Sequence, residues 1–318
     1  MSLRLALIGH PVQHSLSPPL HRAAFSYFGL KGSYELIDVT TQELESTWKE
    51  LIAKSFSGWN VTVPHKEAVY LLLSQNSASC SQQESCLSPE AKLVKAVNTV
   101  RLDSHGKLYG HNTDLPGFYA SLQKQRLALG QAQQHNLARA VILGAGGAAR
   151  ACLGALIRAG YQQVIVLARD KQKASWLCTD LAQSWSAATG SAAQIELSGA
   201  SLSSADLPEQ ASLVVNCTPV GLKHDDLVLS GFDTIISAMT TAPLFIDTVY
   251  SRGHQPTLLC RRAQQLGVAN CDGRAMLVEQ AVLAFEFWCG QLPPVELFEK
   301  ALAEAIETKT SDIDGITT

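Results

Sequence analysis

A glycine-rich turn is the feature that most limits how this chain can fold. The apolar run Ala140–Leu143 leads directly into Gly144-Ala-Gly-Gly-Ala-Ala149, which has a small residue at each fixed position of a G-x-G-x-x-A pattern. Glycines let such a turn close and let backbone N–H groups approach a pyrophosphate at the start of the next helix. The pattern predicts a dinucleotide-binding unit, although the same turn also serves simply to pack a helix tightly on a sheet.

Strand-like and helix-like segments alternate on both sides of this turn. The predicted strands are 5–8, 34–39, 59–63, 140–143, 164–167, 213–216 and 244–246. One predicted helix starts near Pro18, and another follows the glycine-rich turn and ends at Ala159. Further helices are predicted over 41–54 and roughly over 254–266, 273–288 and 295–306. This alternation predicts an α/β protein with parallel sheets covered by helices.

Two domains are expected, because 318 residues are many for a single core. The first is an N-terminal α/β substrate domain, residues 1–113, completed by 251–308 because the last helices have no new strands to cover. The second is a Rossmann-type dinucleotide-binding domain, 114–250, with a cleft between the two. The polar tail 309–318 is expected to be disordered.

The segment Ser74–Cys86 is rich in serine and glutamine and is predicted to be a surface loop. Its two cysteines, Cys80 and Cys86, are expected to be free thiols, with a redox-sensitive pair as the alternative.

Composition narrows the class of partner. The net charge is -3, from 25 basic and 28 acidic residues, and no dense basic run occurs, so neither nucleic acid nor a membrane surface is expected. The apolar run near the N-terminus, Leu5–Ile8, is too short for a leader or a spanning helix, which predicts a cytoplasmic protein. The eight cysteines lack metal-ligand spacing, so no metal is expected.

The choice of cofactor depends on the residues after the strand 164–167. A carboxylate there binds the ribose of NAD, whereas cations accept the 2′-phosphate of NADP. Ala168 occupies the position expected to be acidic, and Arg169 and Lys173 can converge on a phosphate. The pattern predicts NADP, although the cations could simply be solvated. Asp170 could neutralise Arg169 or bind a ribose hydroxyl.

Polar residues stand beside predicted strand ends in the N-terminal half, where ligands of open α/β sheets collect. These are residues 14–17, 60–66, 98–99 and 112–114. Ser15 and Ser17 can present both hydroxyls to one ligand, but Ser17 before Pro18 favours an ordinary helix cap. A lysine after a strand and an aspartate beginning a helix are usually solvated, so neither Lys66 nor Asp114 is evidence alone.

Eight sequence blocks in order resemble those of shikimate dehydrogenases. They are Gly9–Pro18, Asn60–Glu67, Ala96–Thr99, Gly110–Asp114, Gly144–Ala148, Asn216–Gly221, Asp247–Tyr250 and Asp272–Gln280. The resemblance covers residues 4 to 290. It implies an oxidoreductase that uses NADP to interconvert 3-dehydroshikimate and shikimate, in the shikimate pathway to chorismate and the aromatic amino acids.

The resemblance also implies the roles of single residues. The catalytic pair would be Lys66 and Asp114. The substrate would be held by Ser15, Ser17, Thr62, Asn98, Tyr250 and Gln280. The cofactor would contact Gly144, Ala145, Gly146, Gly147 and Ala148 with its pyrophosphate, Arg169 and Lys173 with its 2′-phosphate, and Thr218, Val220, Thr248 and Gly273 on its nicotinamide side. The family usually has an aromatic residue at 65, Asn at 168, Thr at 170 and Arg at 173, where this chain has His, Ala, Asp and Lys.

The chemistry of a ketone reduction agrees with this pair. A cation beside the carbonyl oxygen stabilises the developing alkoxide and can donate its proton, which suits Lys66. A carboxylate at Asp114 would orient the ammonium, and how the two share the proton is left open.

Two other functions remain open at this stage. One is a quinate/shikimate dehydrogenase that uses NAD or NADP, which Asp170 would support. The other is a non-catalytic ligand sensor on the same fold, against which the presence of both Lys66 and Asp114 argues. The protein is expected to be a monomer or a homodimer.

Overall fold

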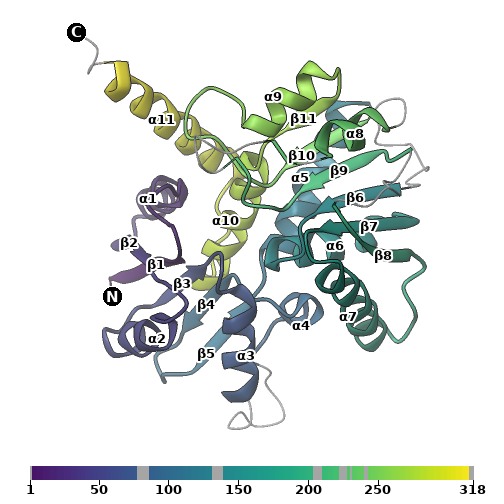
Figure 1. The fold of residues 1–318 in the computed structure, drawn as a ribbon. Coiled ribbons are helices and arrows are strands. Elements are labelled where there is room, and N and C mark those ends of the chain that lie inside the picture. Colours follow the sequence, from purple (N-terminus) through teal and green to yellow (C-terminus); the bar gives the residue numbers. More distant parts are fainter. Residues whose placement is uncertain are drawn as a thin grey trace. The chain divides into compact units, whose positions relative to one another are not determined.

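The computed structural model describes residues 2–76, 86–130, 139–202, 210–221, 228–229, 231–239 and 243–314. The chain forms two compact units, each with its own sheet (Figure 1). Unit 1 comprises Met1–Gly117 and Leu277–Thr318, and unit 2 comprises Phe118–Met276. The expected α/β class is confirmed.

Unit 1 holds a five-stranded sheet in the order β2-β1-β3-β4-β5. Its strands are β1 (Leu3–Gly9), β2 (Gly32–Asp38), β3 (Gly58–Val61), β4 (Thr99–Leu102) and β5 (Leu108–His111). β1 is parallel to β2 and β3, but β4 is antiparallel to both β3 and β5. The three strands predicted for this sheet are parallel as expected, but the sheet also contains β4 and β5, which were not predicted, and β4 runs in the opposite direction. β4 and β5 are joined by a short hairpin, so the sequence between them contains no crossover helix that would indicate two strands.

The reversed direction of β4 decides where the polar residues meet. Because β4 runs against β3 and β5, the start of β4 lies at the same sheet edge as the ends of those two strands. Asn98 immediately precedes β4, Asn112 to Asp114 follow β5, and Thr62 to Lys66 follow β3. Segments that are distant in the sequence thus share one edge of the sheet.

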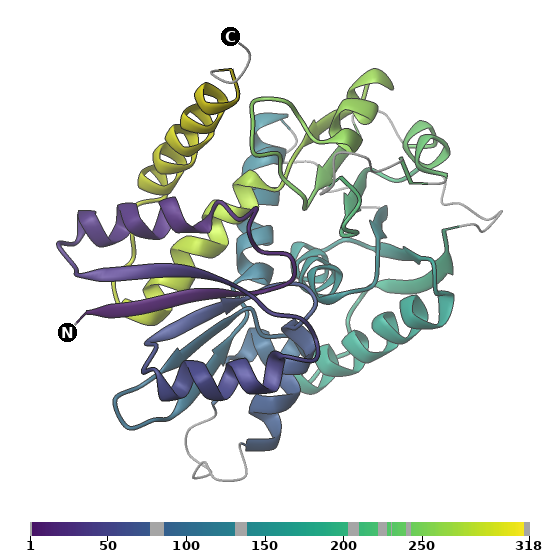
Figure 2. The same ribbon diagram turned by 60° about the vertical axis from the view of Figure 1, so that its left-hand side comes forward.

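Helices cover both faces of this sheet (Figure 2). They are α1 (Ser17–Tyr27), α2 (Leu44–Ala53), α3 (Lys66–Asn76), α4 (Pro89–Val94), α10 (Arg274–Cys289) and α11 (Val295–Asp314). On one face the apolar sides of α2, α3 and α4 pack on the strands, with Trp48 and Trp59 in edge contact at 5.0 Å. On the other face, α1 packs against β2 and α11, and Trp288 of α10 donates from Nε1 to the Val100 carbonyl of β4 at 2.8 Å.

Two expectations about irregular segments are corrected. Helix α11 continues to Asp314, so the predicted disordered tail is wrong for 309–314, and 315–318 lie outside the described residues. The predicted loop Ser74–Cys86 begins inside α3, and 77–85 lie outside the described residues. Cys86 is buried and disulfide-bonded, which contradicts the expected free thiol.

Unit 2 holds a six-stranded parallel sheet in the order β11-β10-β9-β6-β7-β8. Its strands are β6 (Arg139–Leu143), β7 (Gln163–Ala168), β8 (Glu196–Ser201), β9 (Leu213–Asn216), β10 (Leu244–Asp247) and β11 (Ala269–Cys271). Its helices are α6 (Gly147–Ala159), α7 (Lys171–Thr189), α8 (Phe232–Ser237) and α9 (Leu258–Gln265), and α5 (Asp114–Ala128) enters from unit 1. This order is that of a doubly wound dinucleotide-binding sheet.

The second domain extends further than the sequence suggested. The expected boundary after Tyr250 differs from the structure, because α9 and β11 follow it and β11 pairs with β10. α9 and α8 cover one face of the sheet with Leu259 and Phe232 among their buried residues. A strand of three residues is too short to show a period in the sequence.

None of the helices in the part of the chain that the structure describes is long and apolar enough to cross a membrane.

Candidate functional site

Lys66 and Asp114 form an ion pair at the polar edge of the unit 1 sheet. Lys66 begins α3 and Asp114 begins α5, and Lys66 Nζ lies 2.7 Å from Asp114 Oδ2. The two side chains are 12% and 7% exposed, so the pair is largely shielded from solvent but still reachable. An ammonium has three N–H bonds, and the one directed at Asp114 fixes where the others can point. The pair can therefore present an oriented proton donor.

The other oxygen of Asp114 is held by Asn98. Asn98 Nδ2 donates to Asp114 Oδ1 at 2.9 Å and to Thr113 Oγ1 at 2.9 Å, while its Oδ1 accepts from the Thr113 backbone N at 2.8 Å. Both carboxylate oxygens of Asp114 thus accept hydrogen bonds, which fixes the rotation of its carboxylate. Asn98 is buried, and in this structure its amide orients Asp114; its predicted contact with substrate stays a prediction.

Asn98 is in turn held in place by hydrogen bonds from the neighbouring strand β3. Asn60, at 5% exposure on β3, donates from Nδ2 to the Asn98 carbonyl at 3.1 Å and to Thr99 Oγ1 at 3.0 Å. Its Oδ1 accepts from the Tyr34 hydroxyl at 2.7 Å. The polar edge is therefore built on a buried chain of side chains with satisfied partners.

Ser15, Ser17 and Thr62 come from segments that follow β1 and β3. Ser15 Oγ lies 3.1 Å from Ser17 Oγ, so both hydroxyls can serve one ligand. The helix-cap prediction is wrong: α1 begins at Ser17 itself, and its N-cap residue Leu16 has no side-chain cap. Ser15 Oγ accepts instead from the Ser17 backbone N at 3.1 Å. Thr62 N donates to the Ile8 carbonyl, which aligns the two segments.

Gln280 lies close to the start of α5. A Cβ added at Gly117, one turn beyond Asp114, would meet Gln280 N and Cβ at 2.8 Å, so α10 and α5 touch backbone to backbone there. Any larger residue at 117 would push Gln280 away. Gln280 Nε2 donates to the Leu277 carbonyl at 2.8 Å. Tyr250, the remaining residue predicted to bind substrate, belongs to unit 2, three residues beyond β10.

The glycine-rich turn connects β6 to α6 at the point where the strand order reverses. Gly144 has φ +106°, and a Cβ there would meet Cys217 O at 3.0 Å, so only glycine fits. The α6 N-cap is Gly146, and no side chain caps the helix. Backbone N–H groups at the start of α6 are therefore open to an anionic ligand. This fits the pyrophosphate of a dinucleotide, as expected for Gly144, Ala145, Gly146, Gly147 and Ala148.

Asp170 does not pair with Arg169. Its carboxylate caps α7, accepting from the backbone N of Gln172 at 2.9 Å and of Lys173 at 3.2 Å. Arg169 and Lys173 are exposed, and no ion pair of Arg169 occurs among the described residues. The open question about Asp170 is thus answered in part: its carboxylate serves the helix, and the Arg169 guanidinium is available to a phosphate.

The residues predicted for the nicotinamide side gather at the carboxyl edge of β9, β10 and β11. Thr218 and Val220 follow β9, Thr248 follows β10, and Gly273 follows β11. Thr248 N donates to the Asn216 carbonyl at 2.9 Å, and Gly273 N donates to the Val249 carbonyl at 2.9 Å. Neighbouring strand ends thus bring the four residues into one region of unit 2.

Sequence reasoning gave no role to a buried carboxylate at this same edge. Asp247, the last residue of β10, is fully buried, and that burial raises its pKa to about 7, while hydrogen bonds from Thr257, Asn216 and Val249 oppose the rise. The nearby Asp272 carboxylate adds to the rise. An aspartate directly after an apolar strand was the available signal.

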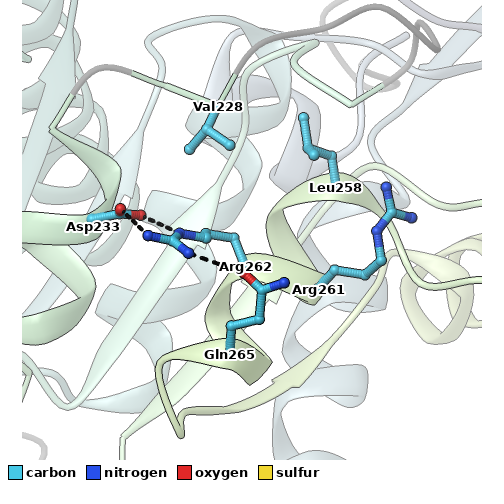
Figure 3. Close-up of a pocket in the computed structure, with 6 residues that line it drawn as sticks. All are labelled: Val228, Asp233, Leu258, Arg261, Arg262 and Gln265. Atoms are coloured by element: carbon cyan, nitrogen blue, oxygen red, sulfur yellow. Dashed lines mark hydrogen bonds and ion pairs between the residues drawn. The ribbon is translucent and has the colours of Figure 1, made fainter.

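A surface pocket of about 380 Å³ in unit 2 does not contain any of these residues (Figure 3). It is lined by Val228, Asp233, Leu258, Arg261, Arg262 and Gln265. Asp233 accepts hydrogen bonds from both Nε and Nη2 of Arg262, and Arg261 donates to the Pro256 carbonyl. The charged side chains that line this pocket are therefore already engaged within the protein, and we assign the pocket no catalytic role. In the described ranges, no three His, Cys, Asp or Glu side chains cluster as a metal site.

Comparisons with known proteins agree with this geometry. The profile described as "Shikimate dehydrogenase substrate binding domain" matches residues 7–100, and that of the "Shikimate 5'-dehydrogenase C-terminal domain" matches 273–303. The shikimate dehydrogenase (NADP(+)) of Symbiobacterium thermophilum is 37% identical over 303 residues, covering 95% of this chain and 94% of the relative.

Two solved structures are similar over almost the whole chain. Shikimate 5-dehydrogenase of Thermus thermophilus, in complex with NADP(H) and shikimate, is 33% identical with a TM-score of 0.70, covering 95% of this chain and 99% of that one. Quinate dehydrogenase of Corynebacterium glutamicum, in complex with NAD, is 29% identical with a TM-score of 0.76, covering 95% and 99%.

Proposed function

Since this chain belongs to the shikimate dehydrogenase family, we propose that it catalyses the reversible NADPH-dependent reduction of 3-dehydroshikimate to shikimate. The observation that carries the proposal is the Lys66–Asp114 ion pair, held at one sheet edge by Asn98. A protein that only bound the ligand would not need an oriented, shielded ammonium. The reaction belongs to the route to chorismate and the aromatic amino acids.

The chain's own residues handle the proton. NADPH, when bound, supplies the hydride to the carbonyl carbon of the substrate. Lys66 Nζ donates a hydrogen bond to the carbonyl oxygen and transfers its proton as the alkoxide forms. Asp114 keeps the ammonium oriented, because its Oδ2 accepts one of the N–H bonds of Lys66. In the direction of oxidation, neutral Lys66 accepts the hydroxyl proton.

The substrate's hydroxyls and carboxylate are assigned to neutral polar side chains. Ser15 and Ser17 offer two hydroxyls 3.1 Å apart, and Thr62 follows the strand beside them. Gln280, packed against the first turns of α5, completes the part of the site that belongs to unit 1. Tyr250 and Asn98 are the remaining assigned contacts. Hydride transfer requires the carbonyl carbon of the substrate to meet the nicotinamide of the cofactor.

NADP is favoured over NAD by the region after β7. Arg169 would bind the 2′-phosphate with its planar fork, and Lys173 would add a second cation. Oδ1 of Asp170 accepts from the backbone of α7, and the carboxylate does not pair with Arg169, which weakens the support for an NAD-dependent quinate enzyme. A monomer or homodimer and a cytoplasmic location stay predictions.

A steady-state assay of the purified protein tests the proposal. The wild-type protein should turn over shikimate with NADP⁺ more efficiently than quinate with NAD⁺, because its cation pair suits the phosphate. Replacing Lys66 with alanine should lower kcat by about 100-fold or more, since the proton donor is lost, with the affinity for NADP⁺ kept. Lys49→Ala removes a lysine from an exposed pair in the same unit and should change nothing. Turnover close to wild type in Lys66→Ala would exclude the proposed role.

A further inference from the structure

One buried carboxylate connects the segments that were assigned to the nicotinamide side of the cofactor. β10 and β9 are neighbours in the parallel sheet (Figure 1). Asp247 ends β10, Asn216 ends β9, and the two are register partners. Both are 0% exposed. A buried charge is costly unless it makes hydrogen bonds, so its partners show which groups Asp247 holds in place.

One chain of hydrogen bonds connects Asp247 to Thr218 through Asn216. Asp247 Oδ1 accepts from Asn216 Nδ2 at 2.8 Å. The Oδ1 of Asn216 in turn accepts from the backbone N of Thr218 at 3.0 Å and from its Oγ1 at 2.7 Å. Thr218 Oγ1 then accepts from Val220 N at 3.3 Å. The Asn216 side chain is therefore held by Asp247 at one end and fixes the turn 218–220 at the other.

The second set holds the turn after β10 and the start of α9. Oδ1 of Asp247 also accepts from the Val249 backbone N at 3.1 Å, which shapes the turn that contains Thr248. Its Oδ2 accepts from Thr257 Oγ1 at 2.6 Å, and Thr257 caps α9 through Cys260 N. Within the described residues Asp247 forms no ion pair; the Asp272 carboxylate, which pairs with Arg274, acts on it electrostatically.

We propose that Asp247 is a positioning residue for the cofactor, which acts through Asn216 on Thr218 and through its own turn on Thr248. The inference rests on the proposed function, because the family resemblance behind that function assigns these threonines to the nicotinamide side. Its physical basis is the acceptor strength of a carboxylate: one oxygen holds two donors from two segments that must keep a fixed spacing. A purely structural role would instead make stability the only property that depends on Asp247.

The test compares variants that cut different connections. Asp247→Ala removes the shared acceptor and leaves buried donors unsatisfied. Asn216→Ala cuts only the path to Thr218 and leaves Asp247 its contacts with Val249 and Thr257. Thr257→Val cuts the connection to α9 and spares the path to Thr218. Asp247→Asn keeps the shape and an oxygen that can accept from Asn216, and Asp233→Asn is a control on the exposed surface of the same unit.

The affinity of the full-length protein for NADP⁺, measured calorimetrically without substrate, is the primary readout. Asp247→Ala and Asn216→Ala should each raise the Kd by about tenfold or more, because a buried acceptor for fixed donors is lost. Asp247→Asn should restore the Kd to within about threefold of wild type. Thr257→Val should lower the melting temperature with the Kd within about twofold, and Asp233→Asn should match wild type.

Several outcomes would overturn the inference. A Kd of Asp247→Ala close to that of wild type would do so. So would a Kd of Thr257→Val that rises together with its loss of melting temperature, because stability alone would then set the affinity. If Asp247→Ala does not fold, an unchanged Kd in Asn216→Ala decides against it. Because the Kd needs no substrate, a wild-type protein that binds NADP⁺ but fails to oxidise shikimate would refute the proposed function alone.

Discussion

His21 makes the stability of unit 1 sensitive to acid. It lies on α1, fully buried, stacked on Tyr34 at 4.5 Å and in contact with the rings of Phe285, Trp288 and Phe298. Among the described residues, neither ring nitrogen has a hydrogen-bond partner. Protonation would place a charge in an aromatic cluster without an acceptor, and burial accordingly lowers the pKa of His21 from 6.5 to about 3.

The sign and size of the effect follow from linkage. The folded protein keeps His21 neutral, while the unfolded chain binds a proton below pH 6.5, so stability is lost as the pH falls below that value. With these two pKa values, the loss is about 2 kcal/mol at about pH 5 and approaches about 5 kcal/mol once the pH is below the folded value of about 3. Leucine at position 21 cannot take up a proton and removes this term.

Urea unfolding of wild type and of His21→Leu, at about pH 8 and about pH 5, measures how the unfolding free energy of each depends on pH. Tryptophan fluorescence monitors the unfolding, and Trp288 beside His21 contributes to the signal. The unfolding free energy of wild type should fall by about 2 kcal/mol more than that of the variant between the two pH values. His105→Gln, which replaces an exposed histidine of the same unit, should keep the wild-type dependence. Equal pH dependence in wild type and His21→Leu would refute the reasoning.

Three further predictions concern the site and the second unit. Asp114→Asn should lower kcat by about 100-fold, because Lys66 loses the anion that orients it, and steady-state kinetics with shikimate measure the loss. Arg169→Ala should raise the KM for NADP⁺ by about tenfold while leaving the KM for NAD⁺ unchanged, and equal effects on both cofactors would show that Arg169 is not a phosphate ligand. Asp180→Ala should lower the unfolding free energy by about 3–5 kcal/mol, because it removes the carboxylate that lies 2.8 Å from the buried Arg150 guanidinium; a loss below about 1 kcal/mol in urea unfolding would contradict this.

Local patterns were enough to predict the unit 2 strands 140–143, 164–167 and 213–216, the glycine-rich turn and the start of the helix after it. Their residues interact mainly with sequence neighbours: the turn needs Gly144 for its own φ angle, and the apolar strands need only to be buried on both faces. The family resemblance likewise depends on the order of short blocks. These features are readable because each is encoded within about ten residues.

Other features depended on partners far away in the chain. The short strand β4 is stabilised by pairing with β3 and β5, β5 by pairing with β4, and β11 by pairing with β10, so their own residues show little period. For the same reason the domain boundary expected after Tyr250 lies after Met276 in the structure.

The sequence by itself determined the fold class and the glycine-rich turn, and its resemblance to a family predicted Lys66 and Asp114 as the catalytic pair. Only the tertiary structure decided what surrounds them: that Asn98 holds Asp114, that Asp170 caps a helix rather than pairing with Arg169, and that Asp247 joins three segments. The physical reason is that a polar side chain has several possible partners of similar strength. Which of them it binds is settled by the backbone that packing brings within hydrogen-bonding distance.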